Sequence, residues 1–285
     1  MADKRVALIT GTSSGFGLLA AVEMARAGYQ VVATMRDPAK KERLMAEAAS
    51  AGAAASVDVR TLDVTKFAEL PGIVSEIVRD HGRIDVLVNN AGYALAGFAE
   101  DISHDELQQQ FDTNFFGAVE MTKAVLPQMR KQASGQVIMV GSISGLVAFP
   151  ITSSYASSKF ALEAWSESLR IELRSLGIRV VLIEPGAFDT DIWEKNVRIG
   201  QKSTSAESLN RERAQRYSDR VKKERGRRAD PRRVAQLIVR VAGMNNPRLR
   251  YRIGKDAEML LWFKRLLPWR MYENMIAKGT KIDVG

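Results

Sequence analysis

Short apolar runs alternate with longer amphipathic stretches over the first two thirds of the chain. Runs such as Val-Leu-Val and Val-Val-Leu-Ile show no polar alternation, which is typical of strands buried on both faces of a parallel sheet. They predict strands over Arg5–Thr10, Gln30–Thr34, Ser56–Leu62, Val86–Asn89, Gly135–Val140 and Arg179–Glu184. The stretches between them predict helices over Phe16–Ala27, Lys40–Ala51, Leu70–His81, Ser103–Lys131 and Tyr155–Leu176.

This alternating order predicts an α/β fold, a doubly wound parallel sheet with right-handed crossovers and helices on both faces. Two signals support the helix boundaries. Ser103 and Glu106 have the spacing of a capping box, and Gly28 and Gly177 each follow a helical stretch as its expected C′ residue. Ligands of such sheets bind at the carboxyl ends of the strands, so residues just after each strand are expected to carry the chemistry.

The composition is that of a globular protein, and it excludes several kinds of functional site. Of 285 residues, 46% are hydrophobic, 26% are charged and none is Cys, which excludes disulfides, Cys-ligated metals and thiol nucleophiles. His81 and His104 have no other ligand at metal spacing, so we expect no metal site and place both at the surface. There is no apolar run of about 18 residues and no secretory leader. These features predict a cytoplasmic protein.

The first predicted strand ends in small residues, and a helical pattern begins among them: Thr10-Gly11-Thr12-Ser13-Ser14-Gly15-Phe16-Gly17. Small side chains let the backbone approach a pyrophosphate, and a helix N-terminus offers free N–H groups and the positive end of its dipole. The spacing is Gly-x-x-x-Gly-x-Gly rather than Gly-x-Gly-x-x-Gly. Tight packing alone would also explain the glycines. Their place after the first strand favours a dinucleotide phosphate site built from residues 11–17.

The end of the second strand bears on which nicotinamide cofactor is bound. An Asp or Glu there would hold a ribose 2′-hydroxyl, whereas an Arg accommodates a 2′-phosphate. This strand ends in Ala-Thr-Met followed by Arg36, and Ser13 and Ser14 add hydroxyls nearby. Asp37 comes one position later, before a proline, where it favours the start of a turn. We therefore expect NADP(H) to be preferred over NAD(H).

Tyr155 and Lys159 lie four residues apart on one face of a predicted helix. A free tyrosine titrates at about pH 10, too high for ready proton exchange in neutral solution. A neighbouring ammonium stabilises the phenolate and lowers this pKa, which makes the tyrosine a usable acid–base group. The pair alone is weak evidence for a catalytic site. Ser142, which follows a strand and lies 13 residues before Tyr155, strengthens this evidence.

Together these motifs resemble the short-chain dehydrogenase/reductase family over about residues 4–192. Thr10–Gly17 is similar to that family's Thr-Gly-x-x-x-Gly-x-Gly turn. The further matches are Asn89-Asn90-Ala91-Gly92 after the fourth strand, Pro185-Gly186 with Thr190 on the nicotinamide side, and Asn114, Ser142, Tyr155 and Lys159 as the Asn-Ser-Tyr-Lys tetrad.

The resemblance implies a Rossmann-like fold in a single domain over residues 1–285. About residues 1–186 would form the cofactor-binding and catalytic core, about 187–233 a substrate lid, and about 250–285 an amphipathic C-terminal extension.

The resemblance also implies roles for the tetrad. Tyr155 would exchange a proton with the carbonyl or hydroxyl oxygen of the substrate, and Ser142 would hydrogen-bond the same oxygen. Lys159 would lower the pKa of Tyr155 and hold the nicotinamide ribose. Asn114 would anchor a water of the proton relay, the alternative being a side chain that satisfies helix backbone at a kink. Ser144 is a rival of Ser142 but lies two residues too close to Tyr155.

Further cofactor contacts follow from the same resemblance. Asp63 would accept a hydrogen bond from the adenine amino group, and Asn90 and Ala91 would line the adenosine ribose. Pro185, the Phe188 backbone and the Thr190 hydroxyl would bind the nicotinamide side and orient the carboxamide.

Gly-Ser-Ile-Ser-Gly around Ser142 and Tyr-x-x-Ser-Lys-Phe-Ala-Leu-Glu from Tyr155 resemble the hydroxysteroid and retinol dehydrogenase branch, as does Arg36 after Ala-Thr-Met. That branch handles apolar alcohols and ketones, so we expect a small hydrophobic carbonyl or alcohol as substrate. The residues expected to line its pocket are apolar: Leu95, Ala96, Phe98, Leu146, Val147, Phe149, Ile151, Phe188, Ile192 and Trp193. The same residues suit a core, so no particular substrate follows.

The net charge of +9 is concentrated at the end of the chain, where residues 211–285 hold 21 Lys and Arg but 8 Asp and Glu. We interpret this region as a solvated face, with a mobile helical flap within the predicted lid. Nucleic-acid binding is not expected, because interleaved aromatics and a recognition motif are missing. Residues 258–270 fit a helix on an anionic membrane surface or one packed on the protein itself, and packing is favoured.

By resemblance, Ser103–Lys131 and Tyr155–Leu176 would form the subunit interface of a homodimer or homotetramer. The leading hypothesis is an NADP(H)-dependent oxidoreductase that interconverts a hydrophobic ketone or aldehyde and its alcohol by hydride transfer. The alternative is a non-catalytic NADP-binding sensor or scaffold whose basic tail recruits anionic partners. The presence of Ser142, Tyr155 and Lys159 favours catalysis, because binding alone does not need them.

Overall fold

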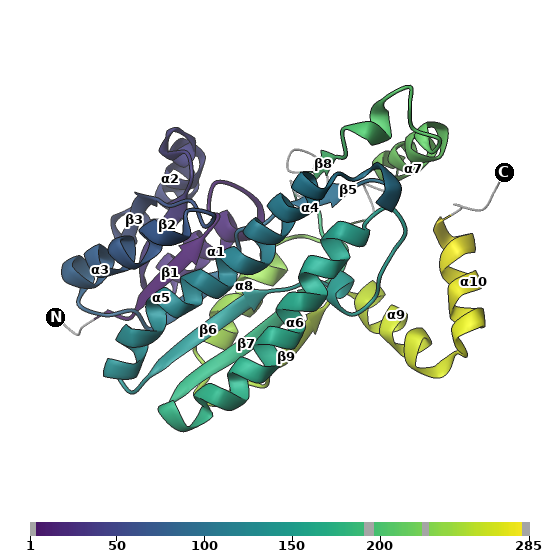
Figure 1. The fold of residues 1–285 in the computed structure, drawn as a ribbon. Helices are drawn as coiled ribbons and strands as arrows, with labels where there is room; N and C mark the ends of the chain where they lie inside the picture. Colours follow the sequence, from purple (N-terminus) through teal and green to yellow (C-terminus); the bar gives the residue numbers. More distant parts are fainter. Residues whose placement is uncertain (1–3, 191–196, 224–227, 281–285) are drawn as a thin grey trace.

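The computed structural model describes residues 4–190, 197–223 and 228–280. In these residues the central element is a seven-stranded sheet of order β3-β2-β1-β4-β6-β7-β9, with each neighbouring pair parallel (Figure 1). Its strands are β1 (Val6–Thr10), β2 (Gln30–Met35), β3 (Val57–Thr61), β4 (Val86–Asn89), β6 (Gly135–Val140), β7 (Ile178–Pro185) and β9 (Arg250–Ile253). The predicted doubly wound parallel sheet is confirmed.

Helices cover both faces of the sheet. One face carries α1 (Gly15–Arg26), α2 (Lys41–Ser50) and α8 (Arg232–Ala242), and the other carries α3 (Leu70–His81), α5 (Gly117–Lys131) and α6 (Ser153–Leu173). Within β1, Ala7 and Ile9 belong to the first core and Val6 and Leu8 to the second. An uninterrupted apolar run is therefore what a strand buried on both faces requires.

The predicted helix boundaries agree with the structure at several ends. The Ser103 hydroxyl oxygen accepts from the Glu106 N–H at 3.2 Å, and the Ser103 N–H donates to the Glu106 carboxylate at 2.9 Å, which completes the capping box. Gly28 and Gly177 have φ of 91° and 71°. This left-handed conformation suits glycine after a helix.

The stretch predicted as one helix over Ser103–Lys131 is divided. It consists of α4 (His104–Phe111), a π-helical turn η5 (Asp112–Phe116) and α5. A π-turn leaves the chain helical, so the sequence predicts the three parts as one helix. Turns of this kind are frequent at functional sites.

The C-terminal extension predicted from residue 250 begins instead with the seventh strand of the sheet, because Arg250–Ile253 forms β9 beside β7. Its sequence, Arg-Tyr-Arg-Ile, alternates charged and apolar residues on a half-buried edge strand and so lacks an uninterrupted apolar run. The helix α8 was also not predicted. It buries Val234, Ala235, Ile238 and Val241 and packs against α1.

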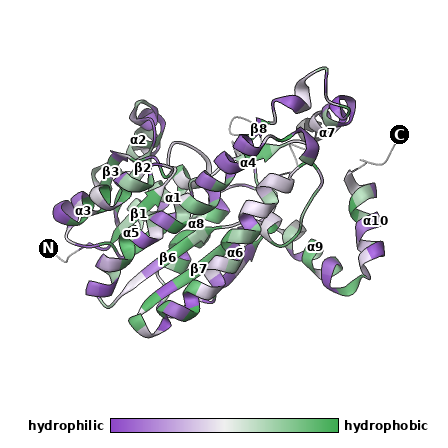
Figure 2. Cartoon of the chain, in the orientation of Figure 1, coloured by the Kyte–Doolittle hydropathy of each residue, from purple (hydrophilic) through white to green (hydrophobic). Residues whose placement is uncertain are grey.

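The chain then continues into α9 (Lys255–Leu266) and α10 (Trp269–Thr280), which extend from the body in Figure 1. Green and purple residues alternate along both helices in Figure 2, as expected for amphipathic helices. Their buried residues, among them Leu261 and Tyr272, pack with Val147 from the loop after β6. Trp262, at 59% exposure, and Trp269, at 67%, lie outside this contact. A membrane or subunit contact of this outer face stays a prediction.

In the described part of the chain, no helix is long and apolar enough to cross a membrane. Large apolar side chains are exposed on α4–α6, among them Leu107, Phe116 and Ile171. The subunit interface expected on these helices stays a prediction.

The predicted lid, 187–233, is described in part. It contributes a short strand, β8 (Val197–Ile199), which pairs in parallel with β5 (Ala94–Ala96), and the helix α7 (Arg211–Lys223). The expected helical flap therefore also contains a strand. The Ser208 hydroxyl donates to Asp101 at 2.7 Å, which fixes this segment to the core. Ile192 and Trp193 lie outside the described residues.

His104 is exposed, as predicted, and His81 is only partly exposed. The His81 side chain is 17% exposed, and its Nε2 lies 2.9 Å from an Asp58 carboxylate oxygen on β3. The end of α3 thus contacts β3, and this contact between two separate elements cannot be predicted from the local sequence around His81.

Candidate active site

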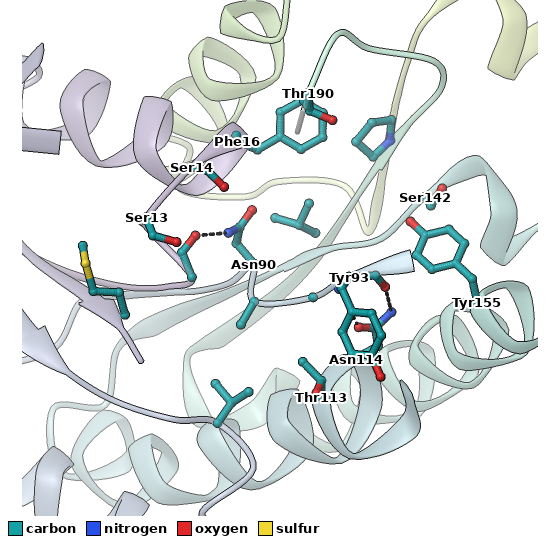
Figure 3. Close-up of a pocket in the computed structure, with 18 of the residues that line it drawn as sticks. Ser13, Ser14, Phe16, Asn90, Tyr93, Thr113, Asn114, Ser142, Tyr155 and Thr190 are labelled. Atoms are coloured by element: carbon teal, nitrogen blue, oxygen red, sulfur yellow. Dashed lines mark hydrogen bonds between the residues drawn. The ribbon is translucent and has the colours of Figure 1, made fainter. Parts of the chain in front are cut away.

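A cavity of about 390 Å³ opens at the carboxyl ends of the strands (Figure 3). Parallel strands bring their following residues to the same edge of a sheet, and six of the seven strands contribute to the lining. The predicted residues that line the cavity are Gly11, Ser13, Ser14, Gly15, Phe16, Arg36, Asp63, Asn90, Ala91, Asn114, Ser142, Tyr155, Lys159, Pro185, Phe188 and Thr190. The fold thus brings together residues spread over much of the chain.

The turn after β1 is held close to the end of β4. A Cβ at Gly11 would lie 2.8 Å from the Ala91 Cα, and Gly11 has a φ of 72°. The Asn90 side-chain amide donates to the backbone oxygens of Thr10 and Gly11 at 2.9 and 3.0 Å (Figure 3). The turn therefore presents bare backbone and the N-terminus of α1 to the cavity, which is the arrangement that a phosphate requires.

Thr12 and Gly17, predicted to contact the cofactor, do not line the cavity. Thr12 is fully buried, and its hydroxyl donates to the Thr34 backbone oxygen of β2 at 3.1 Å. Gly17 lies beneath the turn, where an added Cβ would overlap the Asn90 amide nitrogen and the Gly11 backbone oxygen. Both residues hold the turn in place rather than face a ligand.

Substituting Gly17→Ala should destabilise the protein and weaken dinucleotide binding, because the Gly11 backbone has to move. Overpacking of this kind costs about 2 kcal/mol, measurable by urea unfolding together with cofactor titration. Gly72→Ala is the matched control, since Gly72 is also helical but has no atom within 4 Å of an added Cβ. Equal unfolding free energies for the two variants would contradict this role of Gly17.

Basic residues gather where the second strand ends. Arg36 is exposed and lines the cavity with Ser13, as the sequence indicated, and Lys40 joins them. The Asp37 carboxylate accepts from the Ala39 N–H at 3.0 Å and caps a short turn that contains Lys40. The prediction that Asp37 starts a turn is confirmed. Lys40 was not predicted to belong to this site, although Lys40 is a second basic residue four positions after Arg36.

Asp63, after β3, lines the opposite wall of the dinucleotide region. Its Oδ1 accepts from the backbone N–H and the hydroxyl of Thr65, at 3.0 and 2.8 Å. These bonds fix the carboxylate while leaving Oδ2 for a further donor, which is consistent with the predicted contact to an adenine amino group.

Tyr155 reaches the cavity from α6, and Ser142 from the loop after β6; their hydroxyl groups point toward one another in Figure 3. Tyr155 is 4% exposed. Burial raises the pKa of Tyr155 to about 12, and a hydrogen bond with Ser142 acts in the opposite direction. Without a bound ligand the phenol is therefore held firmly in its protonated form.

Ser144 contributes backbone rather than a side chain to this group. Its N–H donates to the Ser142 hydroxyl oxygen at 3.1 Å, and Ser144 does not line the cavity. The geometry thus favours Ser142 over its rival, in agreement with the spacing to Tyr155.

Lys159 lies one helical turn beyond Tyr155, and its ammonium donates to the Val140 backbone oxygen at 2.8 Å. Its Nζ is 5.9 Å from the centre of the Tyr155 ring. Burial lowers the pKa of Lys159 to about 8, opposed by the Glu163 carboxylate. The expected lowering of the Tyr155 pKa by Lys159 is not seen in this structure: burial raises this pKa, and the opposing effect comes from the hydrogen bond with Ser142.

Asn114 lies within η5 and is 1% exposed. Its amide nitrogen donates to the Tyr93 backbone oxygen at 3.0 Å and to the Ser158 hydroxyl at 3.2 Å, and its oxygen accepts from the Tyr93 N–H at 3.1 Å. The side chain therefore satisfies backbone at a helix irregularity and lines the cavity at the same time. A role with an ordered water stays a prediction.

Tyr93 and Arg198 also line the cavity but were missed in the sequence. The Arg198 guanidinium lies 4.5 Å from the centre of the Tyr93 ring. Arg198 reaches this place because β8 pairs with β5, a long-range contact without a local signal.

The apolar residues expected to line a substrate pocket divide in the structure. Of the described ones, Phe188 lines the cavity and packs edge to face on Phe16, with 5.8 Å between the ring centres. The others lie outside its lining, and those packed with the C-terminal helices or buried at the core are Leu95, Leu146, Val147, Phe149 and Ile151. Whether these residues also line a substrate pocket stays a prediction.

Comparisons with known proteins agree with this geometry. The family described as short chain dehydrogenase matches residues 5–199. The uncharacterized oxidoreductase YusZ of Bacillus subtilis is 43% identical over 97% of this chain and 98% of that protein. The 3-ketodihydrosphingosine reductase of Bacteroides thetaiotaomicron is 33% identical over 98% and 97%, and bovine retinol dehydrogenase 8 is 38% identical over 94% and 88%.

Solved structures show the same fold. A short-chain dehydrogenase from Streptomyces avermitilis has a TM-score of 0.79 at 28% identity and covers 100% of this chain and 99% of that one. ElxO with NADP bound has a TM-score of 0.73 at 26% identity, covering 90% and 99%. A third, from Burkholderia phymatum in complex with NAD, has a TM-score of 0.79 at 24% identity, covering 92% and 93%, and shows the fold alone. The family match, the relatives and the strand-end cavity together establish that the chain belongs to the short-chain dehydrogenase/reductase family of oxidoreductases.

Proposed function

We propose that the protein is an NADP(H)-dependent oxidoreductase that interconverts a hydrophobic ketone or aldehyde and its alcohol. One observation carries the proposal: the hydroxyl groups of Tyr155 and Ser142 face one another in the same cavity into which the glycine turn opens. A dinucleotide that starts at this turn would end beside the two hydroxyls. Acid–base chemistry at that end is what carbonyl reduction requires.

The lining fits a nicotinamide dinucleotide. The turn from Gly11 to Gly15 would hold the pyrophosphate, Asp63 and Ala91 the adenosine, and Lys159 and Thr190 the nicotinamide end. When bound, NADPH supplies the hydride that is transferred to the carbonyl carbon. The chain has to supply the proton and to orient the carbonyl group.

Tyr155 would donate its phenolic proton to the carbonyl oxygen while the carbon receives the hydride, which gives the alcohol and leaves a phenolate. Ser142 would donate a hydrogen bond to the same oxygen and so stabilise the charge that develops on it. Lys159 would stabilise the phenolate until it is reprotonated. The raised pKa of Tyr155 keeps its proton available up to alkaline pH. The attraction between the Lys159 ammonium and the phenolate stabilises the protein only once the phenolate has formed.

The preference for NADP(H) rests on Arg36 and Lys40, two cations at the wall of the cavity after β2. Together with Ser13 they offer charge-assisted hydrogen bonds to a 2′-phosphate. The strand end carries no carboxylate that would favour a ribose 2′-hydroxyl instead.

Replacing Arg36→Ala should raise KM for NADPH about 10- to 100-fold, the value of one or two charge-assisted hydrogen bonds, with little change for NADH. The measurement is the ratio of kcat/KM for the two cofactors. Lys41→Ala is the matched control, because Lys41 is exposed next to Lys40 but outside the cavity lining. Parallel losses for both cofactors, or none, would contradict the assignment of Arg36.

A hydrophobic substrate is supported by the similarity to two relatives. The compounds in their names, 3-ketodihydrosphingosine and retinol, both consist largely of hydrocarbon. We infer a substrate of the same chemical character for this chain, as a ketone, an aldehyde or the corresponding alcohol.

The competing function is a non-catalytic NADP sensor or scaffold. Such a protein would bind NADPH tightly and transfer no hydride to any carbonyl compound. The buried pair of Tyr155 and Lys159 favours catalysis, because desolvating a phenol and an ammonium destabilises the fold and contributes nothing to binding of the phosphates.

A further inference from the structure

Glu163 is a buried carboxyl group that the mechanism above does not use. It lies on α6 one turn beyond Lys159 and is 5% exposed. A Cβ at Gly141 would lie 3.1 Å from Glu163 Oε1, and one at Gly145 would lie 3.0 Å from Glu163 Cγ. These two glycines flank the turn that carries Ser142. The side chain of Glu163 therefore packs directly beneath the turn that presents the serine.

Val140 connects Glu163 to Lys159. The Lys159 ammonium donates to the Val140 backbone oxygen, and Val140 immediately precedes Gly141, against which Glu163 Oε1 lies. The Oε1 atom has no hydrogen-bond partner among the described residues. One short backbone segment thus lies between a buried ammonium and a buried carboxylate.

Glu163 shares its arginine partner with two other carboxylates. Arg250 Nε lies 3.2 Å from Glu163 Oε2 and 3.3 Å from Glu184 Oε1, and Arg250 Nη2 lies 2.9 Å from Glu167 Oε2. The second arginine, Arg252, has its Nε 3.5 Å from Glu184 Oε2.

Two arginines on β9 therefore face three carboxylates from α6 and β7. The Lys159 ammonium, on the same helix, is a further cation that interacts with the Glu163 carboxylate.

We propose that Glu163 is a positioning residue of the reaction, which supports the Gly141–Gly145 turn beneath Ser142 and keeps Lys159 protonated. The kinetic consequence rests on the proposed oxidoreductase function. The effect on the charge of Lys159 is a property of the protein alone.

The pH behaviour follows from the same groups. Burial, and after it the Glu184 carboxylate, raise the pKa of Glu163 to about 7, while burial lowers the pKa of Lys159 to about 8 against the opposing effect of Glu163. As pH rises through 8, Lys159 loses its proton. Removing the Glu163 charge destabilises the ammonium, so the loss should then occur at lower pH.

The test is a titration of the Lys159 ammonium by ¹⁵N NMR in the full-length protein without cofactor, with its signal identified by Lys159→Arg. Glu163→Gln, which preserves size, should lower the Lys159 pKa by about 1 unit, the effect of losing a near opposite charge. The alkaline limb of kcat/KM should also shift to lower pH.

Two further variants make the test specific. Glu167→Gln also removes a carboxylate that lies on α6 and pairs with Arg250, but the Glu167 side chain is 59% exposed. This variant should change the Lys159 pKa by less than about 0.3 unit. Glu163→Asp keeps the charge and should give an intermediate midpoint. Because this titration needs no turnover, an inactive substrate panel does not affect it. An unchanged Lys159 pKa in Glu163→Gln, or an equal shift in Glu167→Gln, would overturn the proposal.

Discussion

Replacing Tyr155→Phe should lower kcat for carbonyl reduction about 10³-fold, within the range for loss of a positioned acid. The variant keeps the ring that fills the buried site and removes only the hydroxyl that faces Ser142. Binding of NADPH should change by no more than about twofold, since the substitution removes an interaction made in the transition state.

The measurement combines steady-state kinetics with cofactor titration by fluorescence. Tyr29→Phe is the matched control, because Tyr29 is also buried and hydrogen-bonded, to Arg5 at 3.0 Å, but lies at the amino ends of the strands. That variant should keep full kcat. Activity retained in Tyr155→Phe, or lost to the same degree in both variants, would contradict the role assigned to Tyr155.

Replacing Ser142→Ala should lower kcat about 10²-fold, the usual loss when one donor to a developing oxyanion is removed. The serine hydroxyl is directed toward the same point as the Tyr155 hydroxyl, so it can donate to the oxygen that Tyr155 protonates. KM for the cofactor should remain unchanged.

Ser144→Ala provides the control for Ser142. Ser144 contributes its backbone N–H to the turn, and this N–H remains in the variant. The activity of Ser144→Ala should therefore stay within about threefold of the parent. A large loss in Ser144→Ala with little effect in Ser142→Ala would reverse the assignment of the two serines.

The sequence predicted the strands that are buried on both faces, because burial on both faces favours a run of apolar residues. The run over Val86–Asn89 has its predicted bounds in the structure. The strand β9 has no such run, because Arg250 and Arg252 occupy alternate positions and bind carboxylates far away in the sequence. Its recognition requires the pairing with β7, which only the folded chain provides.

The site shows the same contrast between local and long-range information. Tyr155, Lys159 and Ser142 follow from one helix and one strand end, so their spacing in the sequence carries the signal. The place of Arg198 depends on pairing between β5 and β8, which no local pattern records. The helix face shared by Tyr155 and Lys159 was correctly identified, but the sign of the Tyr155 pKa shift depends on burial by the whole fold.

Thr12 and Gly17 show how a correct motif can mislead about individual contacts. The motif describes a turn, and a turn needs residues that hold it as well as residues that face the ligand. Thr12 bonds to β2, and Gly17 makes room for Asn90 and Gly11. The sequence indicates the group of residues, and the structure distinguishes the two roles.

The central claim is that this chain transfers hydride from NADPH to a hydrophobic carbonyl group with Tyr155 as proton donor. It is tested most directly with NADPH deuterated at the transferred position, a panel of apolar ketones and aldehydes, and mass spectrometry of the alcohols formed. The parent protein should place deuterium on the carbinol carbon of at least one product, and Tyr155→Phe should not. Tight binding of NADPH with no label in any product would contradict the account and favour the sensor or scaffold.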